Sequence, residues 1–172
     1  MRASLIAGNA RSHPATWLGA LLLLVYLFYA AGAGGMLLTP LVVLCLGIFV
    51  VVASTQLFSP QNALAVFFVL ALCLIALATP SPAWDARSIW LFHGKRIFYD
   101  ASLYVQLDNY AVWSHNDYPP FVPALMASVA HVIGHWNDVS PKVVVPLAML
   151  PFLLVILARI PRLEWRMVFL LV

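Results

Sequence analysis

Charged residues are scarce in this chain. Lys, Arg, Asp and Glu make up 9% of its 172 residues, against about 25% in an ordinary soluble domain. Because 64% of the residues are hydrophobic, too few polar side chains remain to cover a water-facing surface. The composition therefore excludes a soluble globular protein, and it excludes intrinsic disorder, which requires low hydrophobicity and high net charge. A helical membrane protein remains.

Cysteines and runs of basic residues are also few. The two cysteines, Cys45 and Cys73, lie inside apolar segments, so we expect them to pack in an apolar interior and expect no disulfide framework. Nine Lys and Arg against six Asp and Glu give a net charge of +3 without any basic cluster. That pattern lacks the electrostatic footprint of nucleic-acid binding. We expect the basic residues to anchor the chain at membrane lipid headgroups.

Five apolar segments suggest membrane-spanning helices, each of which needs about 20 apolar residues. They cover residues 17–32, 36–54, 63–79, 121–136 and 143–158, and a sixth run opens at Met167 and stops at Val172. The first segment follows Arg2 and Arg11 and also has the layout of a signal peptide. The sequence predicts an all-α fold: a polytopic transmembrane helical bundle of about five spans plus a truncated sixth.

The fourth segment leaves the topology open. Its sixteen residues reach about 24 Å as an α-helix, so it is either a tilted span or a re-entrant helix. With the amino terminus in the cytoplasm, five crossings leave three Lys and Arg inside and six outside, whereas four crossings leave five inside and four outside. Inverting the five-crossing arrangement also satisfies the positive-inside rule. Charge counting therefore does not decide between the topologies.

A polar segment interrupts the apolar runs between Pro80 and Pro120 and holds four of the six acidic residues. Its many aromatic side chains favour the membrane–water interface, and ordered loops of this length are often functional. The sequence therefore predicts three regions. These are amino-terminal transmembrane helices over 1–79, an extracytoplasmic interfacial loop with the candidate active site over 80–120, and further, incomplete membrane helices over 121–172.

Residues 85–99 of this loop predict an interfacial helix. Asp85 either caps its amino terminus or lies in its first turn, where a negative charge suits the helix dipole. Helical spacing places Asp85 and Arg96 on one side of the helix, so both are expected to face one cavity, and it places Ser88 and Lys95 on another stripe. A purely structural interpretation stays open, in which Asp85 only caps the helix and the basic side chains only extend to the phosphate groups of lipids.

A second polar feature lies just before the fourth apolar segment. The sequence Ser-His-Asn-Asp-Tyr-Pro-Pro over 114–120 runs polar groups into a rigid Pro-Pro that suits the first turn of a helix. It predicts either a simple loop-to-helix junction or a site that holds His115, Asp117 and Tyr118 stiffly at the membrane surface.

Histidines in the fourth segment have the spacing of metal ligands on a helix. His131, His135 and Asp138 are separated by four and three residues. Gly134 loosens the helix between them, and no further ligand is evident, so no metal site is predicted, although a divalent metal stays possible. Anchoring at the membrane interface or hydrogen bonding between helices is the favoured role of the histidines.

The two polar features together resemble a known family. Trp84-Asp85-Ala86, Trp90 and Lys95, then His115-x-Asp117-Tyr118-Pro119-Pro120 before an apolar helix, resemble the bacterial integral-membrane glycosyltransferases of the C class (GT-C). These include the lipopolysaccharide sugar transferases. The resemblance covers about residues 80–160. It implies that the chain is the amino-terminal portion of such an enzyme, since family members have more spans.

The resemblance also implies a reaction and a location. The donor would be a sugar linked to polyprenyl phosphate, and the acceptor a hydroxyl of a lipid or glycan. The protein would be multi-pass in the bacterial inner (cytoplasmic) membrane, with the active loop facing the periplasm or exterior. Asp85 would be the catalytic general base. Cationic side chains would bind the donor phosphate: Arg87, Lys95, Arg96 and His115. Acceptor or sugar binding would use Asp117, Tyr118 and Trp90.

Other classes of function stay open. The alternative is a non-catalytic multi-span membrane protein: a transporter half, an assembly subunit or an inactive fragment of the enzyme family. A transporter places ionisable residues near the middle of the bilayer, and these apolar segments hold almost none. No cofactor is certain, and no nucleic-acid partner is expected.

Overall fold

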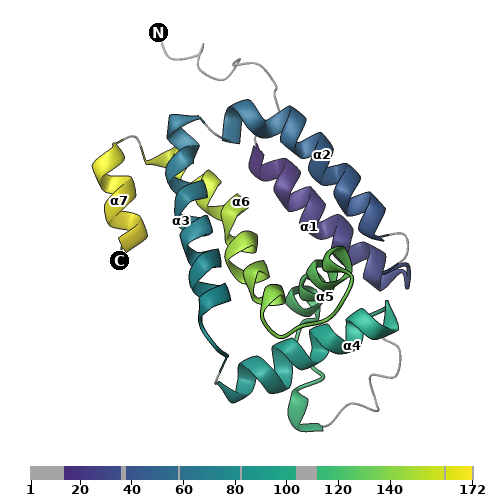
Figure 1. Cartoon of the computed structure of the whole chain (residues 1–172). Coiled ribbons are helices and arrows are strands. Elements are labelled where there is room, and N and C mark those ends of the chain that lie inside the picture. Colours follow the sequence, from purple (N-terminus) through teal and green to yellow (C-terminus); the bar gives the residue numbers. More distant parts are fainter. Residues whose placement is uncertain are drawn as a thin grey trace.

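The computed structural model describes residues 14–35, 38–57, 59–81, 83–103, 112–160 and 162–171. Within these ranges every regular element is helical (Figure 1), which confirms the predicted all-α class. In chain order the elements are α1 (Pro14–Ala30), α2 (Leu38–Leu57), α3 (Pro60–Ala78), the π-helix η1 (Ala86–Leu91), α4 (Phe92–Asp100), the 3-10 helix η3 (Val112–Ser114), α5 (Phe121–Ile133), the 3-10 helix η4 (Ser140–Val143), α6 (Val144–Arg159) and α7 (Leu163–Leu171).

The helices fall on the predicted apolar segments, but most are shorter than a full span. Within the described residues, one helical stretch, Ser140–Arg159, is long and apolar enough to cross a membrane by length and composition. Pro14–Ala30, Asn62–Ala78 and Phe121–Ile133 are apolar but shorter. The local sequence explains why α5 is short. It stops at Gly134, whose φ of 91° breaks the helix. The structure thus establishes a helical fold in which, among the described residues, one helical stretch meets the criteria of length and composition for crossing a membrane.

Helices α1 and α2 lie side by side and antiparallel (Figure 1). In the chain that follows α1, Gly32 and Gly35 adopt φ values of 70° and 83°, which glycine tolerates without strain.

Helix α5 lies at the centre of the fold, and every residue from Pro123 to Ser128 is buried. Helix α4 crosses it closely because Gly94 has no side chain. A Cβ atom there would lie 2.9 Å from the Trp136 ring and 3.1 Å from the Met126 Cβ. A second apolar cluster, with Val69, Leu154 and other buried residues, joins α3 to α6. Helix α4 runs across one end of the bundle (Figure 1).

The predicted helix over 85–99 is present, but it opens as the π-helix η1, which runs directly into α4. Asp85 has helical dihedral angles and its side chain makes no cap hydrogen bond, so the first-turn alternative is correct. A π-helix has more residues per turn than an α-helix, so each residue turns through a smaller angle. The side chains before and after η1 are therefore related by a different angle from the one that a regular α-helix would give.

Candidate functional site

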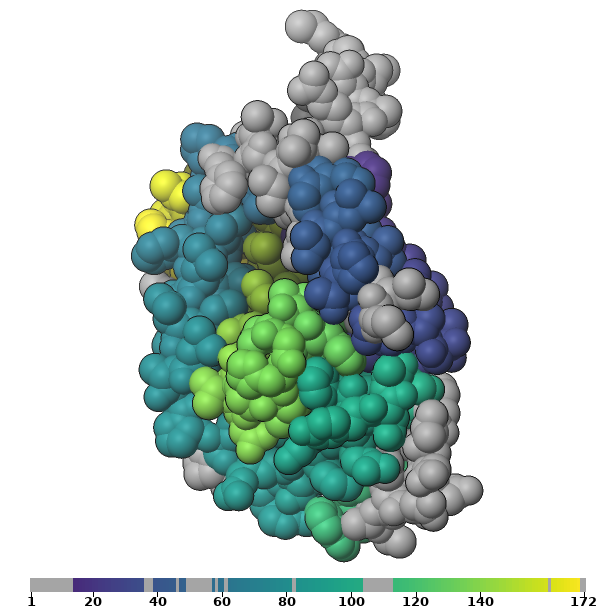
Figure 2. All heavy atoms as spheres, turned by 45° about the vertical axis from the view of Figure 1, so that its right-hand side comes forward, coloured from purple at the N-terminus to yellow at the C-terminus, as the bar shows by residue number. Residues whose placement is uncertain are grey.

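A hollow of about 520 Å³ opens beside η1 and α4. Three separate segments line it: the helical stretch contributes Trp84, Arg87, Ser88, Leu91, Phe92 and Lys95, η3 contributes Trp113, and the loop before η4 contributes Asp138. The space-filling view shows this loop region, around residue 140, against α4 (Figure 2). We call the hollow the cationic cleft, because it combines two basic side chains and one carboxylate with three aromatic rings.

Two further hollows adjoin the cationic cleft. One, of about 360 Å³, shares Arg87 and Asp138 with the cleft and adds Lys142. The Lys142 ammonium donates a hydrogen bond to the Thr79 carbonyl oxygen, which ties η4 to the end of α3. The other hollow, of about 340 Å³, is lined mainly by apolar side chains: Ala86, Trp90, Leu91, Val122, Met126 and Val145, with Ser81 and Lys142. We call it the apolar groove.

These hollows meet at shared residues. Leu91 lines all three, and Lys142 lines both the smaller polar hollow and the apolar groove. The apolar groove therefore adjoins the cationic cleft at Leu91 and the smaller polar hollow at Leu91 and Lys142.

The structure brings together only part of the predicted phosphate-binding set. Arg87 and Lys95 line the same cleft, as their predicted role requires. Arg96 points elsewhere and pairs with Asp100, its Nη2 lying 3.6 Å from Oδ2. His115 lies in the turn before α5 and lines none of the three hollows.

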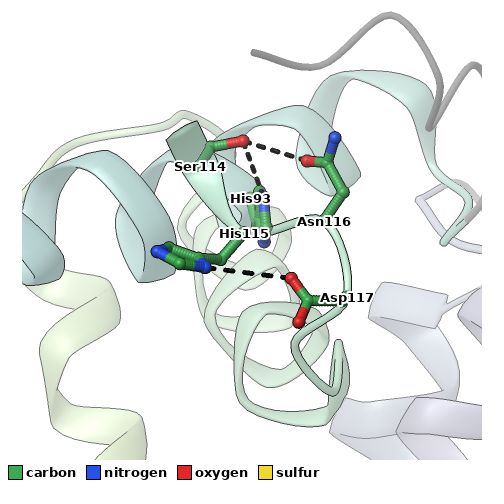
Figure 3. A network of polar contacts seen from close by, with 5 residues as sticks. All are labelled: His93, Ser114, His115, Asn116 and Asp117. Carbon is green, nitrogen blue, oxygen red and sulfur yellow. Dashed lines mark hydrogen bonds and ion pairs between the residues drawn. The ribbon is translucent and has the colours of Figure 1, made fainter. Parts of the chain in front are cut away.

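The residues predicted to bind acceptor or sugar form a separate cluster beside the apolar groove. The His115 ring stacks on Tyr118 with centroids 4.7 Å apart, and Tyr118 lies 5.8 Å from Trp90. His115 Nδ1 lies 3.8 Å from an Asp117 carboxylate oxygen (Figure 3). Trp90 also lines the apolar groove. The cluster joins the groove to the exposed turn, and its role in acceptor binding stays a prediction.

Asp85, the predicted base, is exposed and lines none of the three hollows. The expectation that Asp85 and Arg96 face one cavity is not met in these hollows, because η1 changes the helical register. The carboxylate that does line the cleft belongs to Asp138.

From the sequence, Asp138 was considered only as a possible metal ligand together with His131 and His135. The Trp136 indole N–H donates a 2.8 Å hydrogen bond to its Oδ1. The neighbouring Asn137 side chain accepts hydrogen bonds from the backbone N–H groups of Val139 and Ser140, at 3.0 and 2.7 Å. Asn before Ser-Pro is a local signal for such an ordered turn. That signal predicts a rigid loop. The position of Asp138 in the same cleft as Arg87, however, depends on the packing of α5 against α4.

A buried polar network holds η3 against α4 (Figure 3). His93 Nε2 lies 3.3 Å from Ser114 Oγ, and the Ser114 hydroxyl donates a 2.9 Å hydrogen bond to Asn116 Oδ1. Ser114 is fully buried, so it is unsuited to act as a nucleophile on a substrate. The network instead positions the adjacent Trp113, whose ring centroid lies 5.8 Å from that of Trp84 and 6.2 Å from that of Phe92.

This network predicts a pH-dependent stability. Burial lowers the pKa of His93 below its ordinary value of 6.5, and a hydrogen bond with Asn116 opposes the shift. Protonation then favours the unfolded chain, so stability should fall as pH drops below about 6.5. We expect a melting temperature a few degrees lower at pH 5 than at pH 7, and a smaller difference in His93→Gln. An unchanged difference in that variant would assign the pH dependence to other groups.

Within the described ranges no group of three His, Cys, Asp or Glu side chains is placed to hold a metal ion. His131 instead lies 2.7 Å from the Tyr29 hydroxyl, through its Nδ1. The predicted hydrogen bond between helices is confirmed for this residue, which joins α5 to α1.

The fold and the cleft define a class: an all-helical protein in which a helix across one end of the bundle carries a cationic, aromatic-walled cleft beside an apolar groove. No family model, curated protein or solved structure matches the chain. The resemblance to C-class glycosyltransferases therefore stays a prediction that rests on the residues themselves.

Proposed function

We propose that the protein is a multi-pass membrane protein that binds a polyprenyl-phosphate-linked sugar and transfers the sugar to a hydroxyl of a lipid or glycan. The observation that carries the proposal is the junction of the cationic cleft with the apolar groove. A lipid-linked phosphate requires cations for its phosphate and an adjoining apolar surface for its chain. Leu91 lines both the cationic cleft and the apolar groove, and Lys142 lines the groove and the smaller polar hollow that shares Arg87 with the cleft.

The cations suit a leaving phosphate. Arg87 offers a planar fork that can bind two phosphate oxygens, and Lys95 and Lys142 add compact positive charges. During transfer the acceptor hydroxyl gives its proton to a carboxylate, and its oxygen bonds to the anomeric carbon. The bond from that carbon to the phosphate oxygen breaks and leaves its electron pair on the phosphate. Preorganised cations stabilise this developing negative charge.

Apolar surface supports a membrane location. Large side chains on the outside of the bundle are mostly exposed, including Phe67 at 73%, Phe152 at 69% and Leu74 at 67%. Burying such a side chain is worth about 1.5–3 kcal/mol, so lipid contact would stabilise these faces. With α4 across one end of the bundle, the cationic cleft would lie at headgroup level. By the resemblance, this is the periplasmic or exterior side of the bacterial inner membrane.

Binding of farnesyl phosphate, a short polyprenyl phosphate, tests the proposal. The full chain in lipid nanodiscs should bind it, and farnesol should compete poorly. The double variant Arg87→Ala/Lys95→Ala should bind about 100-fold more weakly, since each charge-assisted contact is worth about 1.5 kcal/mol or more.

The matched control is Arg159→Ala/Arg162→Ala, which removes the same charge from exposed positions outside the three hollows. We expect this control to keep the wild-type affinity. Equal losses in both double variants would mean non-specific surface attraction and would contradict a site in the cleft.

One observation favours the second candidate function, a non-catalytic lipid-phosphate-binding subunit. Asp85, the predicted base, lies outside the hollows that would hold the donor. Incubation with a panel of farnesyl-phosphate-linked hexoses and pentoses, together with lipid and glycan acceptors, separates the two functions, because only a transferase releases farnesyl phosphate and glycosylates an acceptor. If release occurs, an unchanged rate in Asp85→Asn would reject Asp85 as the base.

A further inference from the structure

Phosphate binding leaves the aromatic wall of the cationic cleft unexplained. Trp84 and Trp113 come from different segments, yet their rings lie 5.8 Å apart and both line the cleft. Their exposed fractions are 53% and 56%, so each indole presents about half of its surface. Phe92 adds a third ring beside them.

The elements that carry this wall are held in place by buried contacts. Trp113 precedes the fully buried Ser114, which is anchored by His93 and Asn116. Across the cleft, Asp138 is held through Oδ1 by the Trp136 indole N–H. The aromatic wall and the carboxylate are thus arranged before any ligand arrives, which lowers the cost of binding.

The charges of the cleft indicate which of two ligand classes, a cationic group or a neutral sugar, it can bind. Flat indole surfaces suit either a quaternary ammonium group or the C–H face of a sugar ring. Arg87 and Lys95 line the same cleft as the single carboxylate, Asp138, so a cationic group would meet net positive charge. A neutral ring rich in hydroxyls meets no such repulsion, and Asp138 and Ser88 offer hydrogen-bonding partners to it.

We propose that Trp84, Trp113 and Asp138 form a saccharide subsite within the cationic cleft. The sugar ring lies with a C–H face on the indoles and its hydroxyls donate hydrogen bonds to Asp138, while its phosphate reaches Arg87 and Lys95. The inference rests on the proposed function, since the phosphate-linked lipid supplies the sugar. It assigns sugar recognition to residues other than those predicted from the sequence.

The test compares the affinity of the full chain in nanodiscs for farnesyl phosphate with its affinity for the same lipid carrying glucose, galactose, mannose or arabinose. At least one sugar should raise the affinity about 10-fold, as one or two added hydrogen bonds and a ring contact would. Trp113→Ala and Asp138→Asn should each remove most of this gain, measured as the ratio of the two affinities within the same variant. Trp113→Phe, which keeps an aromatic face, should retain part of it.

Matched controls lie on α7, outside the cleft. Trp165 is 57% exposed and Glu164 is also exposed, so Trp165→Ala and Glu164→Gln remove an indole and a carboxylate elsewhere. Both should keep the full gain.

The following results would each contradict the saccharide subsite. The absence of any gain in the wild type, or a gain that survives both cleft variants, would overturn the subsite and leave the phosphate site standing. Tighter binding of farnesyl phosphocholine than of any sugar derivative would show a cation cage instead. Failure of farnesyl phosphate itself to bind would overturn the proposed function and the subsite with it.

Discussion

Tyr29→Ala is expected to lower the free energy of unfolding by about 3–5 kcal/mol, the range for removing a large aromatic side chain from a core. Tyr29 is fully buried in the cluster that joins α1 to α5. Its hydroxyl bonds to His131 Nδ1 at 2.7 Å, and its carbonyl oxygen accepts a hydrogen bond from the Leu103 N–H at 3.2 Å. The substitution removes the ring packing and the hydroxyl contact together. Thermal or denaturant unfolding of the purified protein measures the loss.

Tyr29→Phe separates these two contributions. It keeps the ring but removes the hydroxyl, so we expect a loss of only about 1–2 kcal/mol. If Phe were as damaging as Ala, the hydrogen bond to His131 would carry the stability, and our assignment to packing would be wrong.

Gly34→Ala should cost about 2–3 kcal/mol, the upper part of the range for overpacking. A Cβ atom at Gly34 would lie 2.5 Å from both the Ala101 carbonyl oxygen and the Tyr29 ring. The Gly34 N–H also donates a 3.0 Å hydrogen bond to that same carbonyl. The α1–α2 turn and the chain after α4 therefore cannot both keep their positions, and the melting temperature should fall.

Gly19→Ala is the matched control for this prediction. No atom lies within 4 Å of a Cβ there, and the residue is inside α1. Alanine should raise helix stability by about 0.5–1 kcal/mol. Equal destabilisation by both substitutions would show that the close contact at Gly34 is not the cause.

The helical class and the positions of most helices could be predicted from the sequence, because they depend on local pattern. Apolar runs ended by glycine or proline mark α1, α3 and α5, and the short Gly-rich link forces the α1–α2 hairpin. Of the four side chains predicted to bind phosphate, the two that line the cleft, Arg87 and Lys95, both lie on the helix that the polar segment predicts. Only the fourth apolar run is longer than its helix, because α5 stops where Gly134 takes a left-handed conformation.

The side chains that share the cleft depended on features that spacing does not reveal. A regular α-helix places Asp85 on the same side as Arg96, whereas the π-helix η1 changes the angle between successive residues, and Asp85 lines none of the three hollows. Asp138 carried no sequence signal for this site. It reaches the cleft because α5 and the loop after it pack against α4 at Gly94.

The sequence by itself determined that this protein is helical and apolar and that its polar chemistry lies near residues 80–120, because composition and periodicity report local conformation and burial. Only the tertiary structure decided which charges and rings meet. Trp84, Trp113 and Asp138 are far apart in the chain, and their meeting requires the crossing of α4 over α5, which is set by side-chain packing between distant segments.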